Sequence, residues 1–256
     1  MKIAVAGGTG VAGRLVVAAA RGAGHTPVVL ARSTGVDVST GTGLEPALAG
    51  VSVVIDVSNV TTLSGRKAIA FFEAATRNLL TAGARAGVGH HVALSIVGCD
   101  RVDLGYYRGK RRQEELVLAG GVPGSVLRAT QFHEIAGQLL QRGRGPFVLI
   151  PRSISQPIAA REVAAALVEL AAAGPAGLAP ELAGPERIAL PDMVRRLIRA
   201  RGGHRVVVPV RLPGAVGTAL RTGGLLPTGT GPRGRQTYDQ WLATDAVPAT
   251  PGPAGP

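Results

Sequence analysis

The first thirteen residues constrain the fold of this chain more than any other segment. The apolar run Lys2–Ala6 has the composition of a short β-strand, and a glycine cluster follows it directly. The next segment, Val11–Arg21, has the apolar spacing of a helix. Glycines let the backbone approach a pyrophosphate closely, and a helix N-terminus offers unpaired N–H groups to its charge. This order of strand, turn and helix predicts a dinucleotide-binding turn made by Gly7, Gly8, Thr9, Gly10, Val11 and Gly13.

Apolar runs like the first one recur along the chain and alternate with helical segments. We expect strands near Lys2–Ala6, Pro27–Ala31, Val53–Val57, His91–Ile96, Gly124–Arg128 and Phe147–Ile150. We expect helices near Val11–Arg21, Gly65–Ala86, Tyr107–Ala119, Phe132–Gln141, Ala160–Ala172 and Pro191–Ala200. The strands are continuous rather than alternating apolar runs, which is typical of strands buried on both faces. The pattern predicts the α/β class, with a Rossmann-type doubly wound parallel sheet.

The pattern changes near Ser153, where short apolar pieces are interrupted by Gly-Pro breaks. We expect a Rossmann core over residues 1–150 and a small C-terminal substrate-binding region over 151–246, integrated with the core. Residues 247–256 are rich in Pro, Ala and Gly, and this composition predicts a disordered tail. The apolar C-terminal third, which has few aromatic residues, indicates a hydrophobic pocket for a mid-sized organic substrate.

The formal net charge of +12 raises the question of nucleic acid binding. Only three of the 28 basic residues are lysine, and the arginines are scattered except in the run Lys110–Arg112. The basic residues are not interleaved with aromatic side chains on which bases could stack. We therefore expect a solvated basic surface and no nucleic acid partner.

The chain has no apolar stretch long enough for a membrane span and no recognisable signal peptide, so no membrane partner is expected. A single cysteine, Cys99, fits a reducing compartment, and we expect a cytoplasmic protein. The histidines lack the spacing of metal ligands, so no metal is implied.

The residues after the second strand bear on which dinucleotide is bound. Sites selective for NAD usually place an acidic residue there, to accept a hydrogen bond from the ribose. This chain has Arg32 and Ser33, which suit a 2′-phosphate, so the sequence predicts NADP(H) in preference to NAD(H). Asp37 is the alternative ribose acid. The stretch around Asp37 and Val38 resembles a separate short strand, however, which favours a position near the adenine.

Polar residues also follow the third strand. Ser58 and Asn59 stand where a cofactor ribose or the linking phosphates would pass. A helix-capping loop is the alternative interpretation of the same residues.

The segment after the fourth strand contains the residues best suited to proton transfer. Tyr106 and Lys110 are four positions apart, so a helix places them on one face. An ammonium group near a phenol lowers the pKa of the phenol and lets it exchange protons near neutral pH. Ser95 could hydrogen-bond a reacting carbonyl. The adjacent Tyr107 is an alternative proton donor, and a purely structural tyrosine pair is a further alternative.

Together these segments resemble the short-chain dehydrogenase/reductase superfamily, and more closely its atypical NmrA-like, NAD(P)H-binding branch. The resemblance covers roughly residues 1–245. It is carried by Ala6–Gly13, Asp56–Asn59, Leu94–Gly98, Tyr106–Lys110, Leu127–His133 and Gln156–Ile158. The chain departs from standard members in lacking an Asn-Asn-Ala-Gly segment, and Asp56–Asn59 stands nearest to that role.

The resemblance implies a Rossmann fold, a nicotinamide cofactor and a reductase that acts on a carbonyl, quinone or imine-like group, with an intermediate of secondary metabolism as one candidate substrate. Tyr106 would supply the proton, Lys110 would tune Tyr106 and hold the ribose, and Ser95 would orient the substrate oxygen. We expect Gln131, Phe132 and His133 to contact substrate, although a structural role is the alternative for His133. The alternative functions are a non-catalytic NADP(H) sensor and a redox-neutral isomerase or epimerase. A homo-oligomer is left open.

Overall fold

The chain passes repeatedly between two structural units, so neither unit is one continuous segment. The computed structural model describes residues 1–143 and 145–244. The larger unit contains residues 1–129, 160–182 and 227–232, and the smaller unit contains 130–159, 183–226 and 233–256. This division differs from the predicted boundary at residue 150, because 130–150 belong to the smaller unit and 160–182 to the larger one. The predicted disordered tail, 247–256, lies outside the described residues.

A six-stranded parallel sheet forms the centre of the larger unit, in the order β2-β1-β3-β4-β5-β8. Its strands are β1 (Lys2–Ala6), β2 (Thr26–Leu30), β3 (Val53–Asp56), β4 (His90–Ile96), β5 (Gly124–Ala129) and β8 (Gly177–Leu178). Every residue of β3 is buried, as expected for a strand covered on both faces. The predicted α/β fold with a doubly wound parallel sheet is therefore confirmed.

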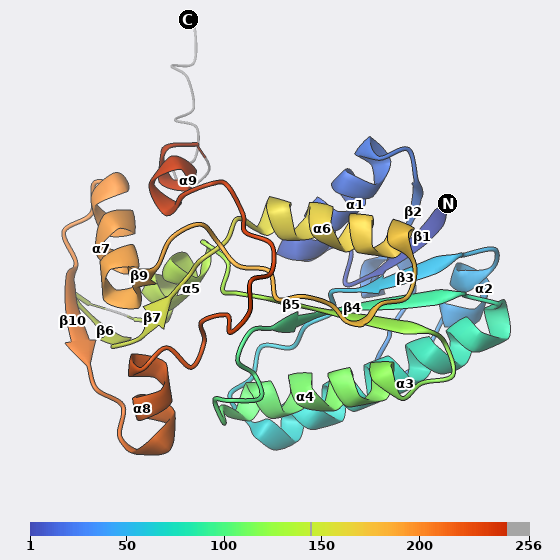
Figure 1. Ribbon diagram of the computed structural model, residues 1–256, viewed down its shortest axis with the longest axis horizontal. Helices are drawn as coiled ribbons and strands as arrows, with labels where there is room; N and C mark the ends of the chain where they lie inside the picture. Colours follow the sequence, from blue (N-terminus) through green and yellow to red (C-terminus); the bar gives the residue numbers. More distant parts are fainter. Residues whose placement is uncertain (144, 245–256) are drawn as a thin grey trace, which may run out of the picture. The chain divides into compact units, whose positions relative to one another are not determined.

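Helices cover both faces of this sheet (Figure 1). On one face, α1 (Val11–Gly22) packs against α6 (Ala160–Ala173), and on the other α3 (Gly65–Ala86) packs against α4 (Gly105–Leu118). A short 3₁₀ turn, η1 (Arg32–Thr34), and the short helix α2 (Leu44–Leu48) follow β2. The expected strand around Asp37 and Val38 is reduced to a single antiparallel bridge between Asp37 and Thr42.

The longest helix, α3, illustrates how the local sequence sets these elements. Its buried side chains recur at helical spacing, for example Phe72, Ala75 and Leu79. The Ser64 side chain caps its first turn by accepting a hydrogen bond from the backbone of Lys67. The helix ends at Ala86 and is followed by the C-cap residue Gly87, whose φ of 75° is readily adopted only by glycine.

The strand order creates a switch point beside β1. The chain runs from β1 to β2 on one side of β1, then returns to place β3 on its other side. Ala6 and Asp56, the last residues of β1 and β3, stand opposite each other in register. The segments that follow them must therefore meet at the carboxyl edge of the sheet, where open α/β folds bind ligands.

The described residues of the smaller unit form two small sheets and four helices. The strands β6 (Phe147–Pro151) and β10 (Val206–Val210) are parallel, and β7 (Ile154–Ser155) and β9 (Ile188–Ala189) are antiparallel. The helices are α5 (Ile135–Arg142), α7 (Leu190–Ala200), α8 (Gly214–Arg221) and α9 (Tyr238–Thr244). A strand predicted over Phe147–Ile150 is present. It pairs with β10 rather than with the central sheet, whose sixth strand is β8.

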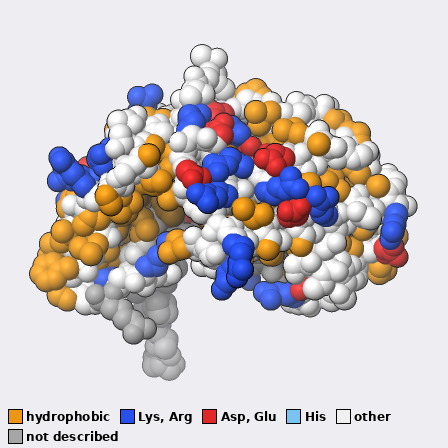
Figure 2. All heavy atoms as spheres, turned by 90° about the horizontal axis from the view of Figure 1, so that it is seen from below, with side chains coloured by type: hydrophobic (Ala, Val, Ile, Leu, Met, Phe, Trp, Pro, Cys, Tyr) orange, Lys and Arg blue, Asp and Glu red, His pale blue; other side chains and the backbone are white. Residues whose placement is uncertain are grey.

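Arginines lie among acidic side chains on the face of the molecule shown in Figure 2. In the larger unit, Arg112 pairs with Glu73 at 2.8 Å, and both Arg108 and Arg111 pair with Asp103. These pairs offset part of the positive charge over α3 and α4. No helix among the described residues is long and apolar enough to cross a bilayer.

Candidate cofactor and active site

The glycine turn after β1 packs tightly against the loop that follows β3. Gly7 has a φ of 77°, in the left-handed region that favours glycine. A Cβ atom on Gly7 would lie 2.9 Å from the Cα of Ser58, and one on Gly13 would lie 2.1 Å from the carbonyl oxygen of Gly7. Side chains at these positions would therefore displace backbone. The glycines allow the turn, the start of α1 and the loop after β3 to form one close-packed cradle.

This cradle fits the pyrophosphate of a dinucleotide. Gly10 is the N-cap of α1 and provides no side-chain cap, and the first turn of the helix carries no acidic residue. The positive end of the helix dipole is therefore not offset locally. The Oγ atom of Ser58 is buried and has no hydrogen-bond partner among the described residues. A buried hydroxyl without a partner is costly, and a ligand oxygen at this position would satisfy it.

The residues after β2 divide into those occupied by local bonds and those open to a ligand. Thr34 accepts a hydrogen bond from the backbone of Ala31 and donates back to it, which closes η1. Arg32 and Ser33 are exposed, and neither side chain hydrogen-bonds a described residue. Asp37 accepts hydrogen bonds from the backbone and hydroxyl of Ser39, which lower the pKa of its carboxyl group. Its Oδ1 atom is engaged in the fold of its own loop, so the alternative of Asp37 as a ribose acid gains no support.

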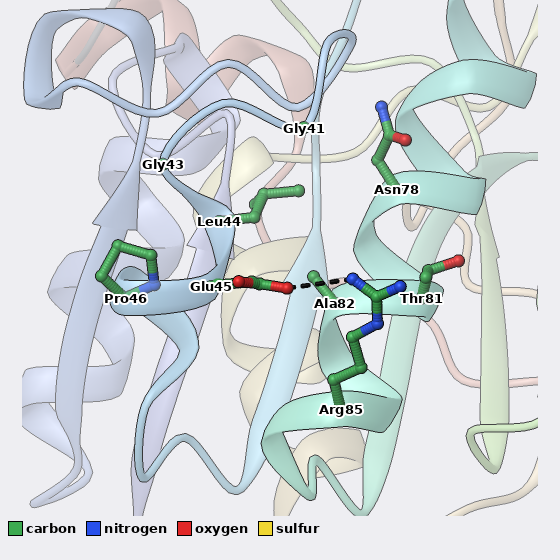
Figure 3. Close-up of a pocket in the computed structure, with 9 residues that line it drawn as sticks. All are labelled: Gly41, Gly43, Leu44, Glu45, Pro46, Asn78, Thr81, Ala82 and Arg85. Atoms are coloured by element: carbon green, nitrogen blue, oxygen red, sulfur yellow. Dashed lines mark hydrogen bonds and ion pairs between the residues drawn. The ribbon is translucent and has the colours of Figure 1, made fainter.

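The loop that carries Asp37 and Val38 is held from α3. Asn78 donates hydrogen bonds to the carbonyl oxygens of Val38 and Ser39, at 3.0 and 3.1 Å. Asn78 also lines a pocket of about 310 Å³ between α2 and α3, which the ion pair of Glu45 with Arg85 spans (Figure 3). The loop of Asp37 and Val38, which is predicted to lie near the adenine, is thus held in place by hydrogen bonds from α3.

Tyr106 meets the loop after β3 through its hydroxyl group. The Tyr106 hydroxyl donates a 2.7 Å hydrogen bond to Oδ1 of Asn59. Asn59 is exposed and directly follows Ser58, which packs against Gly7 in the cradle. The phenol of Tyr106 therefore lies near the cradle. Burial raises the pKa of Tyr106 above its usual range, and the neighbouring Tyr107 and Asp56 add to this shift. Tyr106 is therefore fully protonated at neutral pH.

Because Ser64 caps α3, the alternative that Ser58 and Asn59 form a capping loop is wrong.

The predicted pairing of Lys110 with Tyr106 is wrong in this structure. The Lys110 side chain is buried and donates to the carbonyl oxygen of Leu94, at 2.5 Å, and to the side chain of Gln113. Its ammonium group lies 4.5 Å from the centre of the Phe72 ring, and the Tyr106 ring packs against the same ring at a centroid distance of 5.6 Å. The Phe72 ring thus contacts both side chains. Burial lowers the pKa of Lys110 to about 8.

Lys110 belongs instead to a buried network that sequence reasoning missed. Gln113 accepts from Lys110 and donates a 2.7 Å hydrogen bond to Oδ2 of Asp56. Asp56 in turn accepts from the backbone N–H of Ser58. The network therefore fixes the start of the loop after β3, and Lys110 acts as a positioning residue rather than as a ribose ligand. The spacing of Gln113 three residues after Lys110 was the available signal.

Ser95 does not have the position predicted for it. It is 2% exposed, and its hydroxyl lies 3.8 Å from the Sγ atom of Cys99, under α4. Cys99 contacts Glu114, which forms a two-bond ion pair with Arg128 on β5. Burial and the charge of Glu114 raise the pKa of Cys99 to about 11. Ser95 therefore supports the sheet rather than facing a substrate, and Cys99 is a buried, protonated thiol.

The predicted substrate residues lie in the smaller unit and serve mainly its packing. His133 is completely buried, and its ring packs against Tyr238 and Trp241 at centroid distances of 5.4 and 5.6 Å. Its predicted contact with substrate is therefore wrong. Phe132 is partly exposed and forms a β-bridge with Ile158.

Gln131 has spare hydrogen-bonding capacity. Its Oε1 atom accepts from Ser155, while its Nε2 atom is buried and lacks a hydrogen-bond partner among the described residues.

Nowhere in the described ranges do three or more His, Cys, Asp or Glu side chains form a group able to hold a metal ion.

The chain was compared with protein families, curated proteins and solved structures, and only solved structures match it. No family model matches the chain, and no curated protein matches it. Among solved structures, MoeE5 in complex with UDP-glucose and NAD is 19% identical, with a TM-score of 0.73 over 96% of this chain and 97% of that one. The NADPH-dependent quinone oxidoreductase QOR2 of Escherichia coli, complexed with NADPH, is 20% identical, with a TM-score of 0.70 over 94% and 98%.

Triphenylmethane reductase of Citrobacter sp., complexed with NADP(H), is 19% identical, with a TM-score of 0.67 over 90% and 93% of the two chains. At these identities the likeness concerns the fold. The chain shares its fold with these dinucleotide-bound proteins and with a short-chain dehydrogenase/reductase superfamily protein of Agrobacterium tumefaciens, which is 21% identical with a TM-score of 0.68 over 96% of each chain, so the predicted Rossmann-type fold is confirmed.

Proposed function

We infer that this protein is an NAD(P)H-dependent oxidoreductase that reduces a carbonyl, quinone or imine-like group of a mid-sized organic substrate. The observation that carries this inference is the hydrogen bond between Tyr106 and Asn59. It brings a proton-donating phenol to the loop that closes the glycine cradle. The quinone oxidoreductase and the triphenylmethane reductase, which share the fold, support reduction of such acceptors.

The residues of the cradle would hold the cofactor. The turn from Gly7 to Gly13 and the start of α1 would bind the pyrophosphate, and Ser58 would donate to it. The exposed Arg32 and Ser33 would bind a 2′-phosphate, which favours NADP(H) over NAD(H). A bound reduced nicotinamide would supply a hydride to the acceptor carbon.

Tyr106 would complete the reduction by transferring a proton. Its Oη–H would protonate the acceptor heteroatom as negative charge develops there, and the phenolate would recover a proton from water. The raised pKa of Tyr106 keeps the phenol in the donating form at neutral pH. Asn59 would orient the hydroxyl through the existing hydrogen bond.

The experiment that tests this function is NADPH oxidation followed at the nicotinamide absorbance with a panel of ketones, quinones and imines. Binding of NADPH and NADH is measured in parallel by calorimetry. Turnover with one acceptor class, together with tighter binding of NADPH than NADH, is the expected result. Failure to bind either dinucleotide would overturn the proposal at its first step.

The position of Lys110 favours a second candidate function. With its ammonium group held by Leu94 and Gln113, the protein lacks a lysine beside the phenol of Tyr106. A non-catalytic NADP(H)-sensing protein would need the cradle but not this pairing. It would bind NADPH tightly and show no turnover with any acceptor, and its binding would be indifferent to substitution of Tyr106.

A further inference from the structure

The smaller unit contains a pocket that shares no lining residue with the candidate cofactor and active site. Its volume is about 320 Å³, and all of its lining residues belong to the smaller unit. Its lining includes Arg152, which follows β6, Pro209 near the end of β10, and Pro191 in the first turn of α7. The backbone N–H of Arg152 donates to the carbonyl oxygen of Val210, which fixes Arg152 at this edge.

The lining of this pocket carries an excess of positive charge. Arg152, Arg195 and Arg221 line it, whereas Asp192 is its one acidic residue. Asp192 pairs with Arg195 at 2.7 Å, so the charges of the other two guanidinium groups are not balanced within the pocket. A pocket with two unbalanced guanidinium groups attracts anions.

These two arginines differ in how they are held. Arg221 donates to the carbonyl oxygen of Leu212 and to the hydroxyl of Thr218, at 3.1 and 3.2 Å. Both acceptors are neutral, so they orient the guanidinium group without cancelling its charge. Arg152 is exposed, and its side chain makes no hydrogen bond or ion pair with a described residue. One guanidinium group is thus preorganised, and the other is open to a ligand.

The charge of the whole smaller unit has the same sign. Its three segments contain thirteen arginines, no lysine and five acidic residues, so this unit carries two thirds of the net charge of +12 on less than half of the chain. The resulting field would draw an anion toward the unit before any contact is made.

The remaining walls are apolar. Ile154, Pro191 and Pro209 line the pocket, and Ile154 is 38% exposed although it is a large hydrophobic residue. We propose that this pocket binds an organic anion, with a carboxylate or phosphate group on Arg152 and Arg221 and a compact apolar body against these walls. Both head groups match the planar fork of a guanidinium group. The proposal is independent of the reductase activity.

The test is calorimetric binding of four probes to the full-length protein at low ionic strength. Benzoate and phenyl phosphate carry both the charge and the apolar body, benzyl alcohol lacks the charge, and inorganic phosphate lacks the body. We expect benzoate or phenyl phosphate to bind at least about tenfold more tightly than either control probe, as one charge-assisted hydrogen bond would give. Which of the two binds more tightly identifies the head group.

Variants then locate the site. Arg152→Gln and Arg221→Gln each remove one charge from the pocket, and we expect each to weaken binding about tenfold or more. Arg142→Gln removes the same charge from α5, outside the lining, and we expect it to leave affinity unchanged. Near-ultraviolet circular dichroism verifies that each variant is folded. Equal affinities in all three variants, equal binding of benzyl alcohol, or no binding of either organic anion would overturn the proposal. NADPH titration of the same samples keeps this outcome separate from any failure of the reductase.

Discussion

The Tyr106 hydroxyl donates a 2.7 Å hydrogen bond to Oδ1 of Asn59, across 47 positions of sequence. This contact joins the start of α4 to the loop after β3, and that loop closes the glycine cradle. Because the ammonium group of Lys110 is held by Leu94 and Gln113, Asn59 takes the place of the lysine as the group that orients the phenol. The proposed chemistry therefore depends on the loop after β3 more than on the charge of Lys110.

Replacing Tyr106 by Phe removes the proposed proton donor and leaves its ring contact with Phe72. We expect kcat for NADPH oxidation to fall by about 100-fold or more, while the Kd for NADPH stays unchanged. Steady-state kinetics and calorimetry on the same preparation measure both quantities. Tyr107→Phe is the matched variant, and a larger loss of kcat in that variant would assign the proton to Tyr107 instead.

Arg32→Ala tests the cofactor preference. Loss of a guanidinium contact to a 2′-phosphate should raise the Kd for NADPH about tenfold or more and leave the Kd for NADH unchanged. Arg21→Ala removes an equal charge at the other end of α1 and should alter neither constant. Parallel weakening of NADPH and NADH by Arg32→Ala would mean that Arg32 does not read the 2′-phosphate.

Gly13→Ala tests the close packing of the cradle. The added Cβ would lie 2.1 Å from the carbonyl oxygen of Gly7, and this backbone cannot yield without opening the turn. We expect the free energy of unfolding to fall by about 1–3 kcal/mol and NADPH binding to be lost. Gly22→Ala is the control in the same helix, because a Cβ there meets nothing within 4 Å. Its stability should stay within about 1 kcal/mol of wild type, as urea titration can measure.

The burial of Lys110 predicts a pH dependence of stability. Its pKa is lowered to about 8 in the folded protein, whereas that of an unfolded lysine is about 10.4. Between these values the unfolded chain binds more protons than the native protein, so this residue makes stability rise with pH. Relative to Lys110→Met, the wild type should gain unfolding free energy from about pH 8 to about pH 10. Parallel curves for the two proteins in urea titrations across this range would contradict the buried titration.

The reactivity of the Cys99 thiol should report local opening of the protein around it, and we expect no nucleophilic role for this residue. The thiol is completely buried, and its pKa is raised to about 11, so little thiolate is present at pH 8. We expect a disulfide reagent to modify the native protein far more slowly than the urea-unfolded protein, in which the chain's single cysteine reacts fully. Rapid modification of the native protein would show that the region under α4 opens readily. Addition of NADPH should leave the slow rate unchanged or reduce it.

Much of the larger unit follows from local patterns. The strands β1 to β5 and the helices α1, α3, α4 and α6 lie close to their predicted positions, because each has a continuous or periodic apolar pattern. The short elements of the smaller unit, such as β7, β9 and α8, were not predicted. Two-residue strands and one helix rich in small residues carry too little periodicity to be recognised.

The sequence by itself determined the glycine turn, the strand and helix alternation and the exposed arginine after β2. These features depend on neighbouring residues, on backbone sterics at Gly7 and on apolar periodicity. The tertiary structure alone decided where Lys110 and His133 point. Helical spacing placed Lys110 on one face with Tyr106, but Gln113 and Leu94 offer buried acceptors to its ammonium group, and the Phe72 ring from α3 packs against it. His133 follows a strand end, yet the aromatic rings of α9, about a hundred residues later, enclose it. Such contacts join segments that are far apart in the sequence, so they form only when the chain packs. A local pattern does not specify which distant residues will bury a side chain or satisfy its hydrogen bonds.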